Sequence, residues 1–184
     1  MSYESHVGMH GLMIADIKMN PREFHRMKAV GVDIREWAPE EGHAILTRKN
    51  TFVNTGLNMA LDRLFNIGGP PAAPTGIAVS ADDQSISGST TLLDPASGDT
   101  GFTRAAFDST PVRSSQTVTC VATFTQATVT FAMNKVGILN TTTDAGTGLL
   151  DVIGGTGNSP FTIDLTGVSS WTLTMSILVT ASAT

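Results

Sequence analysis

Residues 170–180 read SWTLTMSILVT. The apolar side chains of Leu173, Met175 and Ile177 alternate with threonine and serine, and this period of two is typical of a half-buried β-strand. The same threonine-rich, weakly charged composition extends over much of the chain, because no glutamate follows Glu41 and no lysine or arginine follows Lys135. The second half of the chain is therefore predicted to be a β-structure.

Further strands are predicted on both the apolar runs and the alternating runs that precede this segment. Glycine, serine and aspartate separate these runs, as expected for short strands joined by turns. The predicted strands cover residues 76–80, 102–107, 117–125, 128–133, 135–140, 148–153 and 161–165, with a long polar loop over residues 81–101. The expected fold is mainly β: a jelly-roll-like or immunoglobulin-like antiparallel β-sandwich with one short helix and an extended N-terminal arm.

The one helix of the body is predicted over residues 54–65. Leu57, Ala60, Leu61 and Leu64 recur at spacings of three and four, which is the pattern of an amphipathic helix, and Asn54 can cap its first turn. The following GPPAAP, residues 69–74, cannot continue a helix because proline fixes φ and restricts the residue before it. An extended connector is expected there.

Residues 1–46 are interpreted as an arm with a short helix, and residues 47–184 as the sandwich body that includes the helix at 54–65. Scattered glycines, methionines and histidines give the arm an irregular appearance. Asparagine and proline at positions 20 and 21 mark a helix start. A segment this short cannot bury its own apolar side chains. We therefore predict that Phe24, Met27, Ile34 and Trp37 bind a partner.

The distribution of charge is uneven along the chain. Residues 1–50 contain seven basic and seven acidic side chains, so the whole net charge of −5 falls on residues 51–184. An acidic body without a basic stripe argues against nucleic acid, which is bound by lysine and arginine neutralising phosphates. With neither a basic start followed by an apolar run nor 18 uninterrupted apolar residues, neither a signal peptide nor a membrane span is expected.

Motifs for catalysis, cofactors and metals are weak. Cys120 is the single cysteine, lies among alternating apolar residues, and is predicted to be a buried, inert thiol. His6 and His10 have the spacing of two ligands on a helix, but Gly8 and Gly11 weaken such a helix. We assign no catalytic, cofactor-binding or metal-binding residue and expect a protein that is not an enzyme.

Other polar groups in the body have simpler interpretations. The glycine-rich residues 154–158 lack the lysine of a phosphate-binding loop and are interpreted as a turn. Loop aspartates near glycine and serine usually cap turns. Paired-carboxylate catalysis is disfavoured for the acids of these loops because aromatic residues are few, and calcium binding because residues 144–148 lack the successive oxygen ligands and closing glutamate of an EF-hand loop. These acids are Asp82, Asp83, Asp94, Asp99, Asp144 and Asp151.

Two stretches together resemble small β-rich structural proteins of tailed bacteriophages, the capsid decoration and tail-associated families. RKNTFVNTGL at residues 48–57, followed by the helix, is similar to their opening. Their later hairpin is similar to residues 103–104, 122–125, 129–131 and 136–140, which end in VGILN. The chain departs from their pattern at Asn134 and Lys135, where an acidic residue is expected. The resemblance covers residues 48–180 and implies a structural role without catalytic residues.

The predicted function is that of a phage virion component. We expect a capsid decoration or cement protein on the outer surface of the shell, assembled in the host cytoplasm, which binds major capsid subunits and copies of itself as a trimer. The alternatives are a tail component, such as a fibre-attachment, baseplate or tail-tip adaptor, and a carbohydrate or host-receptor binding module that uses the loop at 81–101. Phe102 is the one aromatic residue beside that loop, which disfavours sugar binding.

Overall fold

The computed structural model describes residues 7–22, 43–52, 54–68, 72–81, 101–140, 149–154, 161–168 and 170–183. Within these residues the chain forms nine strands and the helix α2, Asn54–Phe65. The strands are β1 (Val7–Met19), β2 (His43–Phe52), β3 (Gly76–Ser80), β4 (Phe102–Ala106), β5 (Val112–Ser114), β6 (Thr117–Thr125), β7 (Lys135–Leu139), β8 (Leu149–Gly154) and β9 (Trp171–Ala183).

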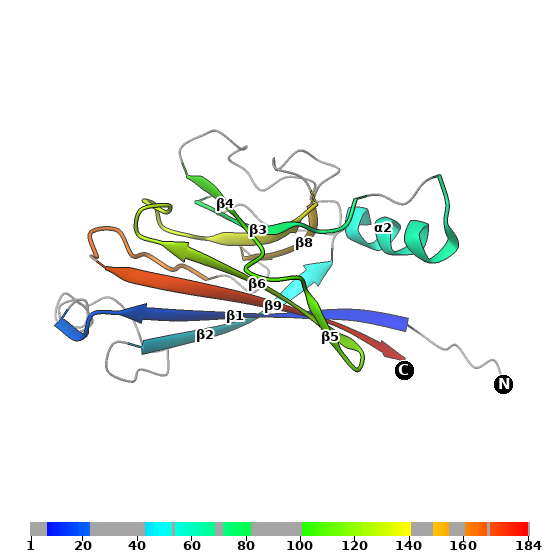
Figure 1. Cartoon of the computed structure of the whole chain (residues 1–184), viewed down its shortest axis with the longest axis horizontal. Coiled ribbons are helices and arrows are strands. Elements are labelled where there is room, and N and C mark those ends of the chain that lie inside the picture. The colour runs from blue at the N-terminus through cyan, green and yellow to red at the C-terminus, as the bar shows by residue number, and fades with distance from the viewer. Residues whose placement is uncertain are drawn as a thin grey trace.

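The strands are arranged as two antiparallel sheets that share β2. Their hydrogen-bonded order is β4-β3-β7-β8-β2-β1-β9-β6-β5. Residues 43–50 of β2 pair with β1, whereas Thr51 and Phe52 pair with β8, so β2 passes from one layer to the other. We call β2-β1-β9-β6-β5 the first sheet and β4-β3-β7-β8 the second sheet. Figure 1 shows them as two layers, with α2 at one end. The mainly β, sandwich-like architecture predicted from the sequence is confirmed.

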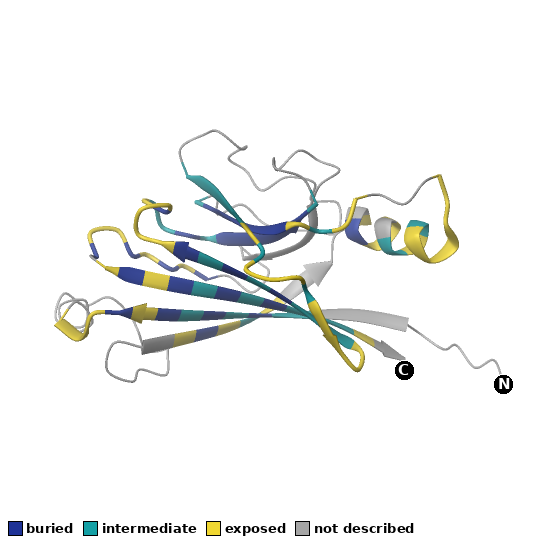
Figure 2. Ribbon diagram, in the orientation of Figure 1, coloured by how far each residue is buried: buried dark blue, intermediate teal, exposed yellow. Residues whose placement is uncertain are grey.

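The core lies between the two sheets and follows the alternation along the long strands. Leu173, Met175 and Ile177 of β9 are fully buried, while Thr174 and Ser176 between them lie on the outer face, as Figure 2 shows by its banded strands. In the second sheet, β3 and β7 are buried at every position. Strands covered on both faces have continuous apolar sequences instead of alternating ones. This explains the runs GIAVS and KVGIL.

The predicted arm over residues 1–46 is wrong for residues 7–19 and 43–46. Residues 7–19 form β1, which pairs with β2 on one side and with β9 on the other, so it is an interior strand. β2 runs through the predicted boundary at residue 46. The alternation in β1 is hidden because Leu12 and Ile14 occupy its outer face, opposite the buried Met13 and Ala15. Phe24, Met27, Ile34 and Trp37 lie outside the described residues, as does the loop at 82–100.

The other element predictions are confirmed except at two strands. The helix over 54–65 and the strands near 76–80, 102–107, 117–125, 135–140, 148–153 and 170–180 are present, whereas the short, exposed β5 was not predicted. Residues 126–128 form a turn, in which Thr128 N and Val129 N both donate to Thr125 O, and residues 129–132 have no regular structure. Residues 161–165 make one isolated bridge, in which Met133 and Ile163 exchange two backbone hydrogen bonds of 2.9 Å.

Candidate interaction surfaces

The part of the chain that the structure describes contains no group of three or more His, Cys, Asp or Glu side chains able to hold a metal ion. Cys120 is buried, as predicted. The side chains of all four histidines, and those of the six loop aspartates considered above, fall outside what the structure describes. None of the helices in the described residues is long and apolar enough to cross a membrane. The remaining candidate sites are surfaces.

The helix α2 has a well-defined C-terminal end. Asn66 adopts a left-handed conformation with φ of 53°, and Ile67 N donates a 3.0 Å hydrogen bond to Asp62 O. A bond from the second residue beyond a helix to its last turn is the Schellman motif, which satisfies carbonyls that the helix leaves open. Gly68, with φ of 67°, then turns the chain towards the connector. The helix therefore ends in a fixed geometry.

The orientation of α2 is unusual for an amphipathic helix. It lies against β8, and Gly56 near its N-terminus is buried while Ala60 is half-buried. The leucine side faces away from the body: Leu57, Leu61 and Leu64 are 38%, 53% and 74% exposed. Phe65, Ile67 and these leucines form what we call the α2 stripe; Phe65 is 66% and Ile67 57% exposed. An amphipathic helix normally turns this side to the core.

A junction of hydrogen bonds fixes the connector between α2 and β3. Thr75 N donates to Leu139 O at 2.8 Å, and Thr75 O accepts from Phe107 N at 3.2 Å. The Thr75 side chain accepts a 2.7 Å hydrogen bond from Arg104 Nη2, and Asn140 Nδ2 donates to Ala72 O at 3.2 Å. Thr75 thus ties β7 and β4 to the segment that follows the helix.

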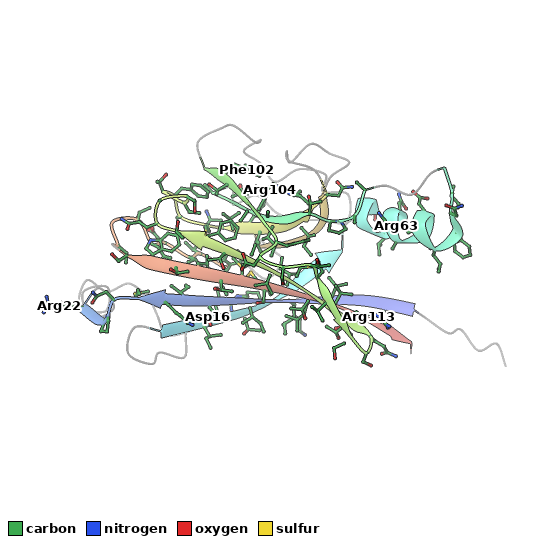
Figure 3. All side chains as sticks on the ribbon, in the orientation of Figure 1. Asp16, Arg22, Arg63, Phe102, Arg104 and Arg113 are labelled. Atoms are coloured by element: carbon green, nitrogen blue, oxygen red, sulfur yellow. The ribbon has the colours of Figure 1, made fainter. Side chains whose placement is uncertain are left out.

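Gly76 allows the Arg104 guanidinium to lie against the backbone of β3. A Cβ atom added at Gly76 would be 2.8 Å from Arg104 Nη2 and 2.9 Å from Arg104 Cζ, and would clash with the carbonyl oxygen of Ala105. Figure 3 labels Arg104 and Phe102, both on β4 of the second sheet. Arg104 and the residues of β7 therefore have a structural role in the second sheet.

Asn134 and Lys135 lie at the other end of β7. Asn134 N donates to Ser80 O at 2.8 Å, and its side chain donates to Ala81 O at 2.7 Å. Asn134 Oδ1 also accepts from Thr162 Oγ1 at 2.9 Å. The neighbouring Lys135 is 3% exposed and lies opposite Ser80 in the register. An asparagine can make these three bonds, whereas an ionised carboxylate cannot donate to a carbonyl.

The outer face of the first sheet is rich in threonine and low in charge. Leu12 pairs with Leu178, and Ile14 and Val121 both lie opposite Ser176, so apolar side chains on three strands form one area. We call Leu12, Ile14, Ile45, Val121 and Leu178 the first-sheet face; Ile45 is 38% exposed. The threonines beside it are bonded to each other in at least one place, where the hydroxyls of Thr117 and Thr180 are 2.8 Å apart.

The edge of β6 beyond β5 is closed by Asp108. Asp108 N donates to Val121 O at 2.9 Å, and its carboxylate accepts from Thr123 N at 3.1 Å and from Thr123 Oγ1 at 2.7 Å. Unpaired strand edges invite pairing with other chains, and proteins commonly block them. This edge is therefore unsuited to strand addition, and the candidate surfaces are the α2 stripe and the first-sheet face.

Comparisons of the chain with protein-family models, with curated proteins and with solved structures gave no match.

Proposed function

We propose that this protein is a structural subunit of a bacteriophage virion, a decoration or cement protein that binds the outer surface of the capsid shell. The observation that carries the proposal is the group of apolar side chains on the outer face of the first sheet of a small acidic protein. Large exposed apolar areas mark protein–protein contacts. The resemblance of residues 48–180 to phage structural proteins is the reason for proposing a phage particle.

The first-sheet face is the proposed contact with the shell. It is broad because it covers several strands, and its apolar residues are bordered by a few charges such as Asp16, Lys18 and Lys49. An apolar centre with a polar rim is the usual anatomy of a specific interface. The arm residues predicted from the sequence to bind capsid subunits, Phe24 and Trp37 among them, remain part of the proposal. So does the jelly-roll-like or immunoglobulin-like topology.

Capsid binding tests the proposal directly. Purified capsids that lack the protein are sedimented with the full chain and with Ile45→Lys, whose new ammonium lies opposite Asp16 in the register and so favours a folded strand. We expect Ile45→Lys to weaken binding at least about tenfold, since a buried lysine charge at an interface centre costs more than about 1.4 kcal/mol. Leu64→Lys, on α2, is the matched control and retains binding.

Two results would contradict this assignment. If the wild-type protein binds to no capsid preparation, the proposed decoration role is wrong. If wild type and Ile45→Lys bind equally well, the first-sheet face is not the contact with the capsid. A protein found only in tails supports the tail component predicted as the alternative.

A further inference from the structure

The α2 stripe has the spacing of a helix–helix contact. Leu57, Leu61 and Leu64 are separated by four and three residues, which is the alternation of the two core positions in a heptad, and Phe65 widens the stripe on one side. No charged residue lies on the stripe. The only charged residues of α2 are Asp62 and Arg63. Since an α-helix turns by about 100° per residue, both lie about 100° or more around the helix axis from the centre of the stripe. Such a surface fits a second apolar helix.

The stripe is also complementary to itself. A twofold axis passing near Leu61 would place two α2 helices antiparallel, with Leu57 of one copy against the partner's Leu64. Closed pairs of identical chains use one patch in this way, and antiparallel helices bring the positive end of each dipole near the negative end of the other. Three parallel helices, as in a trimer around α2, would place like ends together.

The position of α2 permits this pairing. In Figure 1 the helix lies at one end of the second sheet and reaches past the ends of β1 and β9 in this view. Two copies that meet through α2 are therefore joined at this end of each body. This matters because each copy has a net charge of −5, and the uncharged stripe lets them approach without placing like charges in contact.

The area is sufficient for a reversible pair. With about 200 Å² for each fully exposed large apolar side chain, the exposed fractions of the stripe correspond to roughly 600 Å² per copy. A pair would bury roughly 1,200 Å², the lower limit of specific interfaces. Interfaces near this lower limit are typical of weak, transient complexes, so we expect reversible pairing and not a permanent dimer.

We propose that two copies of this chain associate through their α2 stripes as an antiparallel, twofold pair. This contact joins copies of the chain to each other and is independent of the contact with a capsid. It replaces, for this surface, the trimer expected from the sequence. The partner is chosen because the stripe matches itself in register, in charge and in area.

Sedimentation velocity of the full chain over a concentration series tests the pairing. Wild type is expected to shift from the 19.3 kDa monomer towards twice that mass as concentration rises. Leu61→Glu is expected to raise the dissociation constant at least about tenfold. Val112→Glu is the matched control. Val112 is 64% exposed on β5 of the first sheet and is not part of the α2 stripe, so this change should leave pairing unchanged. Circular dichroism verifies that each variant is folded.

Cysteine cross-linking tests the antiparallel register. Leu61→Cys is expected to form disulfide-linked pairs with itself, and a mixture of Leu57→Cys with Leu64→Cys is expected to link, whereas Leu57→Cys alone is not. Cys120 does not interfere because it is buried.

Three outcomes would overturn the proposal. They are a wild type that stays monomeric at every concentration, a Leu61→Glu variant that pairs as well as wild type, and Leu57→Cys linking to itself, which indicates a parallel bundle. A loss of capsid binding with pairing intact would overturn only the proposed function.

Discussion

Gly76→Ala should destabilise the second sheet by a predictable amount. The new Cβ would be 2.8 Å from Arg104 Nη2 and would clash with the carbonyl oxygen of Ala105. The guanidinium is the end of a flexible side chain and can move, but the carbonyl belongs to β4, which is paired with β3 through Ile77↔Ala105. Relief therefore requires β4 to shift. Overpacking of this kind costs typically 1–3 kcal/mol, and we expect about 2 kcal/mol.

Equilibrium denaturation in urea measures this loss of free energy of unfolding. In thermal denaturation, a loss of about 2 kcal/mol should lower the Tm by about 4–8 °C for a chain of this size. Gly167→Ala is the matched control. Gly167 has φ of 73° and nothing within 4 Å of an added Cβ, so its substitution tests backbone strain alone and should cost about 1 kcal/mol.

A double variant separates the two neighbours of Gly76. Arg104→Ala removes the guanidinium but leaves the Ala105 carbonyl, so Gly76→Ala in that background should still cost at least about 1 kcal/mol. The reasoning is refuted if the free energy of unfolding of Gly76→Ala lies within about 0.5 kcal/mol of the wild-type value. It is also refuted if Gly76→Ala causes no loss of stability in the Arg104→Ala background.

Three other predictions concern the core and the sheet edge. Asp108→Ala should lower the free energy of unfolding by about 1–2 kcal/mol, because it removes two hydrogen bonds from Thr123 to a carboxylate; an unchanged urea midpoint would contradict the role of Asp108 at this edge. Leu173→Ala should cost about 2–5 kcal/mol because Leu173 is fully buried, whereas Thr172→Ala on the exposed face should cost under about 1 kcal/mol; similar losses would place the core elsewhere. The Cys120 thiol should react with a thiol reagent only on unfolding, since it is 4% exposed, and rapid labelling of the native protein would show that β6 opens.

Periodic segments of the sequence were predicted well because one physical signal dominates in each. The strand over 117–125 and the helix over 54–65 were found with their observed bounds, since alternation and helical spacing are undisturbed there. β1 was missed because Leu12 and Ile14 make both of its faces apolar, which obscures the period of two. A strand was wrongly predicted over residues 128–133, because Thr128 bonds back to Thr125 in a turn that ends at residue 128, and only Met133 makes a β-bridge.

The candidate surfaces required the structure. The leucine spacing in α2 identifies an amphipathic helix but not which side meets the body, and the helix turns the buried Gly56 inward and Leu64 outward. The first-sheet face also could not be predicted from the sequence. It arises only when the register brings Leu12 opposite Leu178, residues that are far apart in the chain.

Copy number per purified particle is the most direct test of the central claim that this is a shell protein. In purified phage particles, the protein would be quantified by mass spectrometry against the major capsid protein. We predict a ratio near one, or a simple fraction such as one half or one third. A ratio of a few per cent would contradict the decoration role and place the protein in the tail, and its absence from the particle would contradict the virion assignment itself.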